Sequence, residues 1–384
     1  MRLIHLGDLH LGKSLGDFDL IEDQKYILDR ILEIVDKNNI DGVLIAGDVY
    51  DRALPSEAAT NLLDYFLNEL SKRKVRVYMI SGNHDSDERL GYGSRMFEQS
   101  GISICARYEG TLEKRTIKDE FGEVDIWLLP FVKASQVRYY HPDEKIADYD
   151  SAVKAVIRNA QIDPDRRNVI VSHQFVSGPS SDPYLGGSEC VGTRSVGQVE
   201  KIGYDCFDMF DYAALGHIHS PQEVGRKEVR YSGSPLKYSL NEVDNDKSVP
   251  VVTIGKKGSV DIELVKIKPL RDMRHLKGPL IRLIDKNTAQ DTDDFIYATL
   301  TDEDVIDDAM GIMQQVYPNT VRIDYDNSRT REVTQVDAPD AVRHMTFEEL
   351  AGDFYEKMFG CSINEEEMRI LKETAKEAGI YETC

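Results

Sequence analysis

The chain of 384 residues is long enough for one large domain and one or two smaller ones, and its apolar content of 41% is ordinary for a globular protein. No run reaches the roughly 20 apolar residues of a membrane span, and the N-terminus lacks the basic and apolar regions of a signal peptide, so we expect a cytoplasmic protein without membrane contact. The net charge of −21 disfavours a free-standing nucleic-acid binder, which would need a basic surface.

The first third of the chain alternates buried strands with amphipathic helices. Residues 1–6, 42–47 and 75–81 are apolar runs of strand length. Apolar residues at helical spacing separate them: Ile27, Leu28, Ile31, Leu32 and Val35, then Ala58, Leu62, Leu63, Phe66 and Leu70. This β-α-β-α-β order predicts a parallel sheet.

The middle of the chain is richer in strands than a simple alternating fold requires. Six further apolar runs read as strands, at 125–131, 168–172, 212–215, 228–232, 250–254 and 260–266. We therefore expect an α/β fold in which a second sheet packs behind the first and helices flank both.

A smaller unit begins after residue 268. The runs at 278–285 and 320–325 predict a small α/β unit, whose helical region we place in the acidic stretch from 285 to 308, with nine Asp or Glu and one Lys. Residues 326–345 are polar and contain a Pro, as is typical of a linker. The predicted division is 1–268, 269–326, 327–345 (linker) and 346–384.

The last part predicts two short helices. Thr346 with Glu349, and Ser362 with Glu365, each form an S/T-x-x-E capping box, and Gly360 is placed to end the first helix. One face of that helix is apolar: Phe347, Leu350, Phe354 and Met358. So small a unit cannot bury this face alone, so the face packs either on the same chain or on a partner.

Polar side chains follow many of the predicted strands. They are Asp8 and His10 in "GDLHLG", Asp48 in "GDVYD", Asn83, His84 and Asp85 in "GNHD", His173 in "VSHQ", and His217 and His219 in "GHIH". Each motif alone is more often a turn or a buried polar residue, but their conjunction at strand ends, where ligands gather in α/β sheets, predicts one dinuclear metal site. Carboxylate, amide and imidazole ligands suit manganese, iron or zinc.

The spacing of these residues suggests separate roles. Asp48 is the best candidate for the carboxylate that bridges two ions. His84 can point past the metals and protonate the leaving group or stabilise charge on the phosphate, with Asp85 orienting its ring. Asp51 is ambiguous, and we expect it to hold its loop rather than to touch a metal.

The five cysteines take no part in this site. They are scattered and include no CxxC pair: Cys105, Cys190, Cys206, Cys361 and Cys384. This arrangement predicts free thiols, with neither a disulfide framework nor a structural zinc site.

The motifs from Asp8 to His219 resemble those of the calcineurin-like metallophosphoesterase superfamily: D-x-H, G-D, G-N-H-D/E, H and G-H-x-H. Within it, "MRLIHLGDLHLGKSL", "AGDVYDRALPS", "DYAALGHIHSPQ" and "VRYSGSPLKYS" are similar to the SbcD family of nuclease subunits, and "PLRDMRHLKGP" extends the resemblance over most of the chain. The resemblance implies a metallophosphoesterase β-sandwich, with a capping domain at about residues 270 to 325 that flanks DNA.

The resemblance also implies roles for single residues. One manganese ion would be held by Asp8, His10, Asp48 and His219, and the other by Asp48, Asn83, His173 and His217. His84 would be the catalytic histidine. Archaeal and eukaryotic relatives carry a His where this chain has Asp51, so the role of that His does not transfer.

The activity and partners implied are those of a DNA nuclease. The family acts as a 3′-to-5′ exonuclease on duplex ends and as an endonuclease on single strands and hairpins, forms dimers, and works with a coiled-coil ATPase, SbcC, bound here by helices at 346–378. Such a partner would supply the DNA-binding surface that the negative charge denies this chain. The alternatives are a small-molecule phosphodiesterase or protein phosphatase on the same scaffold, and a catalytically silent adaptor.

Overall fold

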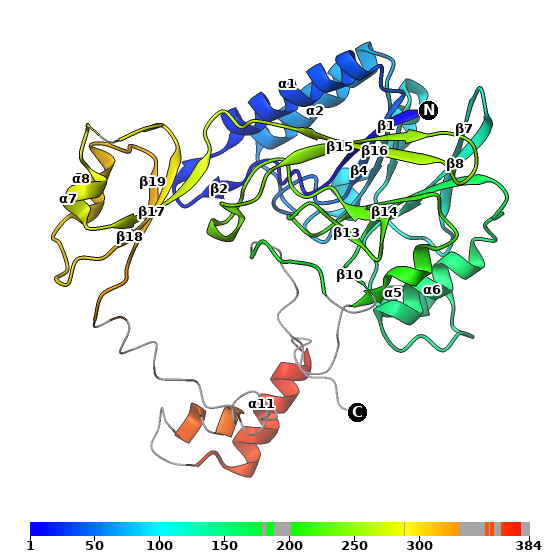
Figure 1. Ribbon diagram of the computed structural model, residues 1–384. Helices are drawn as coiled ribbons and strands as arrows, with labels where there is room; N and C mark the ends of the chain where they lie inside the picture. The colour runs from blue at the N-terminus through cyan, green and yellow to red at the C-terminus, as the bar shows by residue number, and fades with distance from the viewer. Residues whose placement is uncertain are drawn as a thin grey trace.

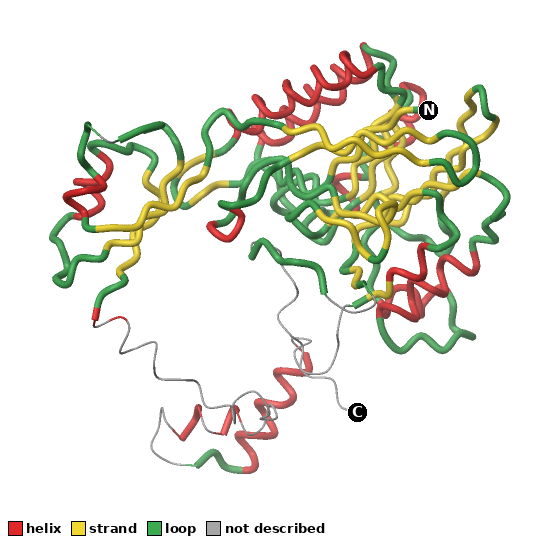
Figure 2. The backbone as a smooth tube through the Cα atoms, in the orientation of Figure 1, coloured by secondary structure: helices red, strands yellow, loops and turns green. Residues whose placement is uncertain are grey.

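Two six-stranded sheets lie face to face in the body of the molecule, and helices cover their outer sides (Figure 1, Figure 2). The structure is a computed structural model. It describes residues 1–178, 182–187, 201–287, 289–328, 330, 350–352, 354–356 and 362–377. The two packed sheets confirm the expected fold class.

The first sheet has the order β16-β15-β1-β4-β5-β6. Its strands are β1 (Arg2–Leu6), β4 (Gly42–Ala46), β5 (Arg76–Ile80), β6 (Ile102–Cys105), β15 (Ser248–Ile254) and β16 (Val260–Lys266). β1, β4, β5 and β6 run parallel, while β15 and β16 add an antiparallel edge. The parallel strands therefore deliver the loops after β1, β4 and β5 to one edge of the sheet.

The second sheet has the order β13-β14-β12-β9-β8-β7. Its strands are β7 (Glu113–Asp119), β8 (Gly122–Leu129), β9 (Arg167–His173), β12 (Tyr212–Gly216), β13 (Gln222–Val224) and β14 (Arg226–Tyr231). β8, β9, β12 and β14 are parallel. Two-stranded pairs complete the body: β2 (Ser14–Leu15) with β3 (Phe18–Asp19), and β10 (Val176–Ser177) with β11 (Ile202–Gly203).

Three apolar layers hold the sandwich together. Its interior packs Leu44 and Tyr78 of the first sheet against Val171 and Tyr212 of the second, all nearly inaccessible to solvent. The first sheet is covered by α1 (Ile21–Asn38) and α2 (Glu57–Lys72), and the second by α5 (Ala134–Tyr140) and α6 (Tyr149–Asn159). The predicted apolar face of α2 is wrong at one position: Ala59 is buried, whereas Ala58, which the pattern placed on that face, is exposed.

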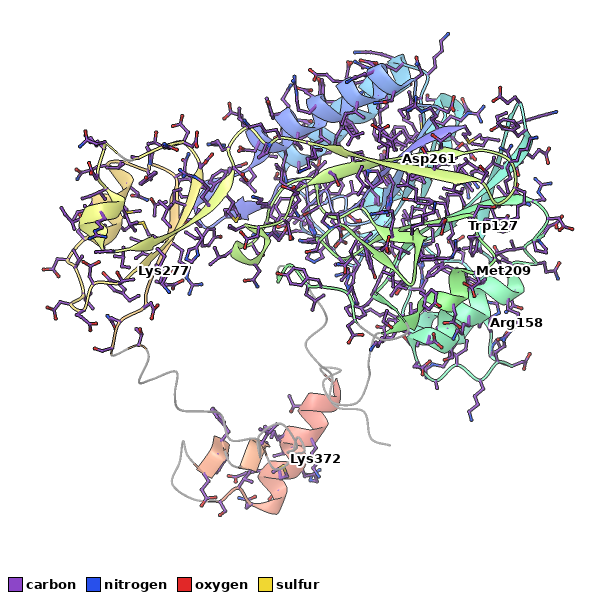
Figure 3. All side chains as sticks on the ribbon, in the orientation of Figure 1. Trp127, Arg158, Met209, Asp261, Lys277 and Lys372 are labelled. Atoms are coloured by element: carbon purple, nitrogen blue, oxygen red, sulfur yellow. The ribbon has the colours of Figure 1, made fainter. Side chains whose placement is uncertain are left out.

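Short helices complete the body. They are α3 (Asp87–Leu90), α4 (Ser94–Phe97), and the 3-10 helices η1 (Glu98–Ser100), η2 (Tyr204–Phe207) and η3 (Leu240–Glu242). Trp127 of β8 lies within the body, while Lys277 belongs to a separate small sheet (Figure 3).

That small sheet consists of the parallel strands β17 (Met273–Gly278), β18 (Phe295–Leu300) and β19 (Thr320–Tyr325). α7 (Leu280–Leu283) and α8 (Ala309–Gln314) contribute to its own apolar core around Ile296, Leu300 and Met313. The expectation of a helical region throughout 285–308 is wrong, because that stretch contains the central strand, β18. The apolar residues that β18 buries favour a strand there, although acidic residues flank it on both sides.

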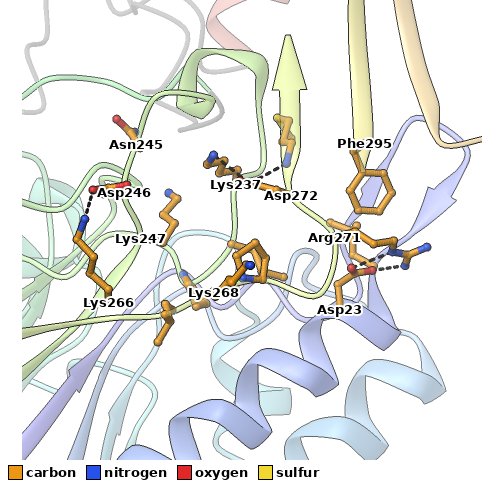
Figure 4. A pocket seen from close by; sticks show the side chains of 16 residues that line it. Asp23, Lys237, Asn245, Asp246, Lys247, Lys266, Lys268, Arg271, Asp272 and Phe295 are labelled. Carbon is orange, nitrogen blue, oxygen red and sulfur yellow. Dashed lines mark hydrogen bonds and ion pairs between the residues drawn. The ribbon is translucent and has the colours of Figure 1, made fainter. Parts of the chain in front are cut away.

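Ion pairs join the small sheet to the body. Arg271 donates from Nε to Oδ1 of the buried Asp23 in α1 at 3.0 Å, and its guanidinium lies over the ring of Phe295. Lys237 pairs with Asp272 at 3.0 Å. Between these contacts is a cavity of about 290 Å³ (Figure 4).

At the C-terminus the described part contains α11 (Glu365–Glu377). The predicted Ser362–Glu365 capping box is wrong by two residues: the side chain of Asn364 accepts from the backbone N–H of Glu366 and Glu367, and the Glu367 carboxylate accepts from the backbone N–H of Asn364. Thr346, Glu349, Phe347, Met358 and Gly360 lie outside the described residues, as does most of the predicted linker.

Candidate metal centre

Four candidate ligands come from the first sheet. Asp8 and His10 lie in the loop after β1, Asp48 follows β4, and Asn83 follows β5. Each of the three carboxylate and imidazole ligands in this group is at most 2% exposed. The parallel order of the strands is the reason that these loops meet.

Three more candidate ligands come from the second sheet. His173 is the last residue of β9, and His217 and His219 directly follow β12. All three are buried. The backbone N–H of His217 donates to the carboxylate of Asp8 at 2.9 Å, which joins the loops of the two sheets.

Four of these residues have a left-handed backbone, which costs energy outside glycine. Their φ angles are 53° at Asp8, 43° at His10, 48° at Asp48 and 101° at His217. Such conformations persist only where the surrounding structure enforces them, and they gather at functional sites. The fold thus holds these side chains in position at a cost in stability.

Glycines before the ligands permit this close packing. A Cβ on Gly216 would lie 1.9 Å from the carbonyl oxygen of Ala46, and one on Gly82 would lie 2.1 Å from Oδ1 of Asp48. A Cβ on Gly47 would lie 2.5 Å from Nδ1 of His173. These motifs therefore begin with glycine because any larger side chain there would overlap neighbouring atoms.

The donor atoms converge on two points. At the first, Nε2 of His10 lies 3.1 Å from Nε2 of His219 and 3.6 Å from Oδ2 of Asp48, and Asp8 is in reach of the two imidazoles. At the second, Oδ1 of Asn83 lies 3.0 Å from both Nε2 of His173 and Nδ1 of His217. Asp48 also approaches the second point, because its Oδ2 lies 3.4 Å from Nε2 of His173.

Burial and mutual charge shift the pKa values of these groups. Burial, opposed by the nearby imidazoles of His173 and His219, raises the pKa of Asp8 to about 6. Burial, reinforced by the charge of His173, lowers the pKa of His217 to about 3. Burial also favours the neutral forms of Asp48 and His173, but their mutual attraction outweighs it, holding the pKa of Asp48 well below its usual range and raising that of His173 to about 9.

The donor set fits divalent cations. Nδ1 of His10 is buried without a hydrogen-bond partner among the described residues, and the facing lone pairs of imidazoles and amide oxygen repel unless a proton or cation lies between them. Oxygen and imidazole donors of this type suit hard or borderline divalent ions. Three overlapping groups of Asp and His side chains could hold such ions.

His84 belongs to one of these groups, with His10 and Asp48, and its side chain is 19% exposed, more than the buried ligands. Its Nδ1 lies 2.9 Å from the carbonyl oxygen of Asp51, and its Nε2 lies 4.0 Å from Oδ2 of Asp48. Because a carbonyl oxygen only accepts, this contact assigns the proton to Nδ1 and turns Nε2 toward the site.

The expectation that Asp85 orients His84 is wrong. The Asp85 carboxylate instead accepts hydrogen bonds from the backbone N–H of Val49, Tyr50 and Gly82, at 3.1, 2.9 and 2.9 Å. Asp85 therefore fixes the loop that carries Asp48. Asp51 pairs with Lys13 at 2.7 Å, and its carboxylate oxygen lies 3.6 Å from Nδ1 of His10.

Sequence reasoning missed a buried group behind His219. Oε1 of Glu242 lies 3.5 Å from Nδ1 of His219, and Lys247 pairs with Glu242 at 2.5 Å. Tyr238 packs its ring against His10 and His219. Glu242 and Lys247 stand in a polar segment of the sequence that carries no motif, so the sequence alone does not connect them to the site.

Two protein-family models match the chain: calcineurin-like phosphoesterase over residues 1–221, and the type 5 capsule protein repressor C-terminal domain over residues 269–359. The first match spans more than half of the chain and contains every candidate ligand. The chain therefore belongs to the calcineurin-like phosphoesterase family, which uses divalent metal ions. It is also similar to the SbcD subunit of the nuclease SbcCD from Staphylococcus epidermidis, with 33% identity over 329 residues, covering 84% of this chain and 85% of that relative.

These similarities define a metal-dependent phosphodiesterase of the SbcD nuclease type. Within the described ranges, no helix combines the length and the apolar character that crossing a bilayer requires. Cys105 and Cys206 are buried free thiols, while the other three cysteines lie outside those ranges.

Proposed function

We propose that the chain is a two-metal DNA nuclease that works as the nuclease subunit of an ATP-dependent SbcCD-type complex in DNA repair and recombination. It cuts duplex DNA as a 3′-to-5′ exonuclease and cuts single strands and hairpins as an endonuclease. The observation that carries the proposal is the convergence of oxygen and imidazole donors from both sheets on two adjacent points, combined with similarity to an SbcD relative.

The two points divide the ligands into two sets. Asp8, His10, Asp48 and His219 hold one ion, and Asp48, Asn83, His173 and His217 hold the other. We assign manganese from the resemblance of the motifs to the SbcD family, since the donor set itself suits manganese, iron or zinc alike. When bound, the pair of ions activates water for attack and supplies a Lewis acid to the phosphate.

His84 supplies a proton or stabilises charge at the phosphate. Its hydrogen bond to the Asp51 carbonyl fixes the ring, so that Nε2 faces the same side as Asp48. In its imidazolium form, Nε2–H can donate to the leaving oxygen. The partial exposure of the side chain leaves room for a substrate, unlike the buried ligands.

We propose the division that the sequence suggests: a nuclease domain at 1–268, a capping domain that flanks DNA at 269–326, a linker at 327–345 and partner-binding helices at 346–384. Support comes from the separate apolar core of the small sheet. The scattered cysteines agree with a cytoplasmic location.

An SbcC-type coiled-coil ATPase binds the C-terminal helices. Support comes from apolar side chains that the structure leaves exposed there: Phe354 at 65%, Ile370 at 53% and Leu371 at 38%. The partner also supplies basic surface for DNA, since this chain carries a net charge of −21. Tight, salt-sensitive duplex binding by the chain alone would contradict that division of labour.

The chain forms a homodimer through the surface of α3 and α4. Tyr92, Met96 and Phe97 are 83%, 77% and 39% exposed, and Tyr92 and Phe97 also line an apolar cavity against α2. Exposed apolar side chains gathered in this way are typical of an interface. Met96→Glu should convert a dimer in sedimentation to a monomer, whereas Tyr139→Glu, at another exposed aromatic, should not.

The test of the function compares manganese-dependent cleavage of end-labelled duplex, hairpin and single-stranded DNA with hydrolysis of bis(p-nitrophenyl) phosphate. Cleavage of DNA by the wild type and its loss in His84→Ala would support the nuclease. Hydrolysis of the small ester alone would favour a small-molecule phosphodiesterase, and inactivity on every substrate would favour a silent adaptor.

A further inference from the structure

The segment after β14 brings a buried acid and a buried base to the back of His219. Glu242 ends the 3-10 helix η3 and is fully inaccessible to solvent, and Lys247 is 6% exposed. A charged pair this deeply buried is costly unless its hydrogen bonds are satisfied. The pair therefore requires a reason in the structure.

The contacts of Lys247 converge on His219. Its ammonium donates to Oε2 of Glu242 at 2.5 Å, to Oγ of Ser234 at 2.8 Å, and to the backbone carbonyl oxygen of His219 at 2.9 Å. An ammonium has three donor hydrogens, and each of these three acceptors can take one. The base is thus fixed in place and fixes the backbone of His219.

Glu242 contacts the imidazole ring of His219, whereas Lys247 contacts its backbone. Its Oε2 is bound to Lys247, which leaves Oε1 beside Nδ1 of His219 at 3.5 Å, while Tyr238 donates its backbone N–H to the same Oε1 at 3.2 Å. Nε2 of His219 is the atom that faces Nε2 of His10. The carboxylate and the ligand point consequently lie on opposite edges of one imidazole.

We propose that Glu242 and Lys247 are positioning residues for the first metal site, which hold His219 by its ring and its backbone so that Nε2 faces the ion. This inference rests on the proposed function. A carboxylate behind a ligating imidazole fixes its orientation and raises its basicity, and removing such a partner weakens metal binding by roughly 10- to 100-fold.

Lys247 also borders the cavity between the body and the small sheet, together with Lys237 and Asp272 (Figure 4). Lys247 is therefore approached from the junction with the small sheet, while Glu242 lies fully buried behind it. Its substitution changes the support of the ligand without adding a side chain to the substrate side.

The experiment measures manganese affinity by calorimetry without DNA. Glu242→Gln keeps the shape but removes the buried negative charge that balances the Lys247 ammonium, so it should lower the melting temperature. The double variant Glu242→Gln/Lys247→Met removes both charges and should recover stability. Both variants should bind one of two manganese ions roughly 10- to 100-fold more weakly, and the spin-coupled dimanganese signal in electron paramagnetic resonance should decline.

A matched control lies at the opposite end of β12. Asp211 is also buried, pairs with Lys257 at 3.0 Å and accepts the backbone N–H of Asn168 at 2.7 Å. Asp211→Asn should lower the melting temperature without changing manganese affinity, which separates loss of stability from loss of positioning.

Wild-type manganese affinity in the stable double variant would overturn the inference and leave the nuclease intact. Absence of manganese binding or of DNA cleavage in the wild type would instead overturn the proposed function. Equal weakening of manganese binding by Asp211→Asn would also contradict the inference, because the effect would then follow stability alone.

Discussion

Nε2 of His10 lies 3.1 Å from Nε2 of His219, although 209 positions separate these residues in the chain. The two nitrogens belong to loops of opposite sheets, and both are buried. Two neutral imidazoles can meet in this way only if a proton or a cation lies between their lone pairs. Folding of the sandwich thus brings two candidate ligands of one metal site into contact.

Removing divalent metal should accordingly destabilise the protein. Each site that binds only the folded state adds about 2.7 kcal/mol when free metal is at 100 times its dissociation constant. We expect chelation to lower the melting temperature by several degrees and added manganese to restore it. Differential scanning calorimetry with chelator and then excess manganese checks this, and an unchanged melting temperature would contradict it.

His84→Ala should lose turnover and keep its metals. A positioned acid typically contributes roughly 100- to 10,000-fold in rate, and Nδ1 of His84 is already held by the carbonyl oxygen of Asp51 while the side chain stays 19% exposed. DNA cleavage and manganese content are measured on the same sample. His141→Ala serves as the control and should keep normal activity. His141 lies at the end of α5, outside the site, and is hydrogen-bonded to the hydroxyl of Tyr108. Metal loss in His84→Ala would make His84 a ligand instead.

Asp48→Ala should empty both metal sites, because Asp48 approaches His10 and His173, one at each point. Asn83→Ala should weaken only one site, since its Oδ1 lies 3.0 Å from His173 and from His217, both at the second point. Calorimetric titration with manganese distinguishes two lost sites from one. A single tight site remaining in Asp48→Ala would show that the carboxylate does not bridge.

Gly216→Ala should destabilise the protein and disturb metal binding. Its new Cβ would meet the backbone oxygen of Ala46 at 1.9 Å, so the two sheets would have to separate locally, at a cost of about 1–3 kcal/mol or more. At Gly7, the closest atom to a new Cβ is the side-chain oxygen of Ser232 at 3.1 Å. Urea unfolding should therefore show a smaller loss for Gly7→Ala, and equal losses would refute the steric argument.

His5 should make stability fall at mildly acidic pH. Burial, aided by the charge of Arg230, lowers its pKa from 6.5 to about 3, so only the unfolded chain gains this proton as the pH falls below about 6.5. This contribution to stability is complete above that pH and is lost progressively toward pH 3. The loss amounts to roughly 2 kcal/mol at pH 5. The measurement is the free energy of unfolding at pH 7 and 5 in wild type and His5→Gln, and the variant should show the smaller decline.

The sequence predicted the body well because its buried strands are continuous apolar runs that end in polar motifs. Val43 to Ala46 before Asp48, and Val169 to Ser172 before His173, could be read directly. Parallel pairing then required these ends to meet. The seven candidate ligands were consequently all visible as residues that end or follow strands.

Contacts that depend on tertiary folding could not be read in the same way. Asp85 follows His84 in sequence, yet its carboxylate turns to backbone N–H groups of the loop after β4. Glu242 reaches His219 only because the chain returns after β14. At the C-terminus, Ser362 and Asn364 both precede a glutamate by three residues, and local geometry selected Asn364.

The ligands are shared between two sheets that meet closely at Ala46, whose side chain lies in the core between them and whose backbone carbonyl oxygen accepts a hydrogen bond from Nδ1 of His173 at 2.7 Å. The spacing between the two sheets thus sets the distances between metal ligands of one sheet and those of the other. A larger residue at this position would shift His173, His217 and His219 together relative to Asp8 and Asp48. Metal preference and rate can therefore be altered from the apolar interior, with every ligand left in the sequence.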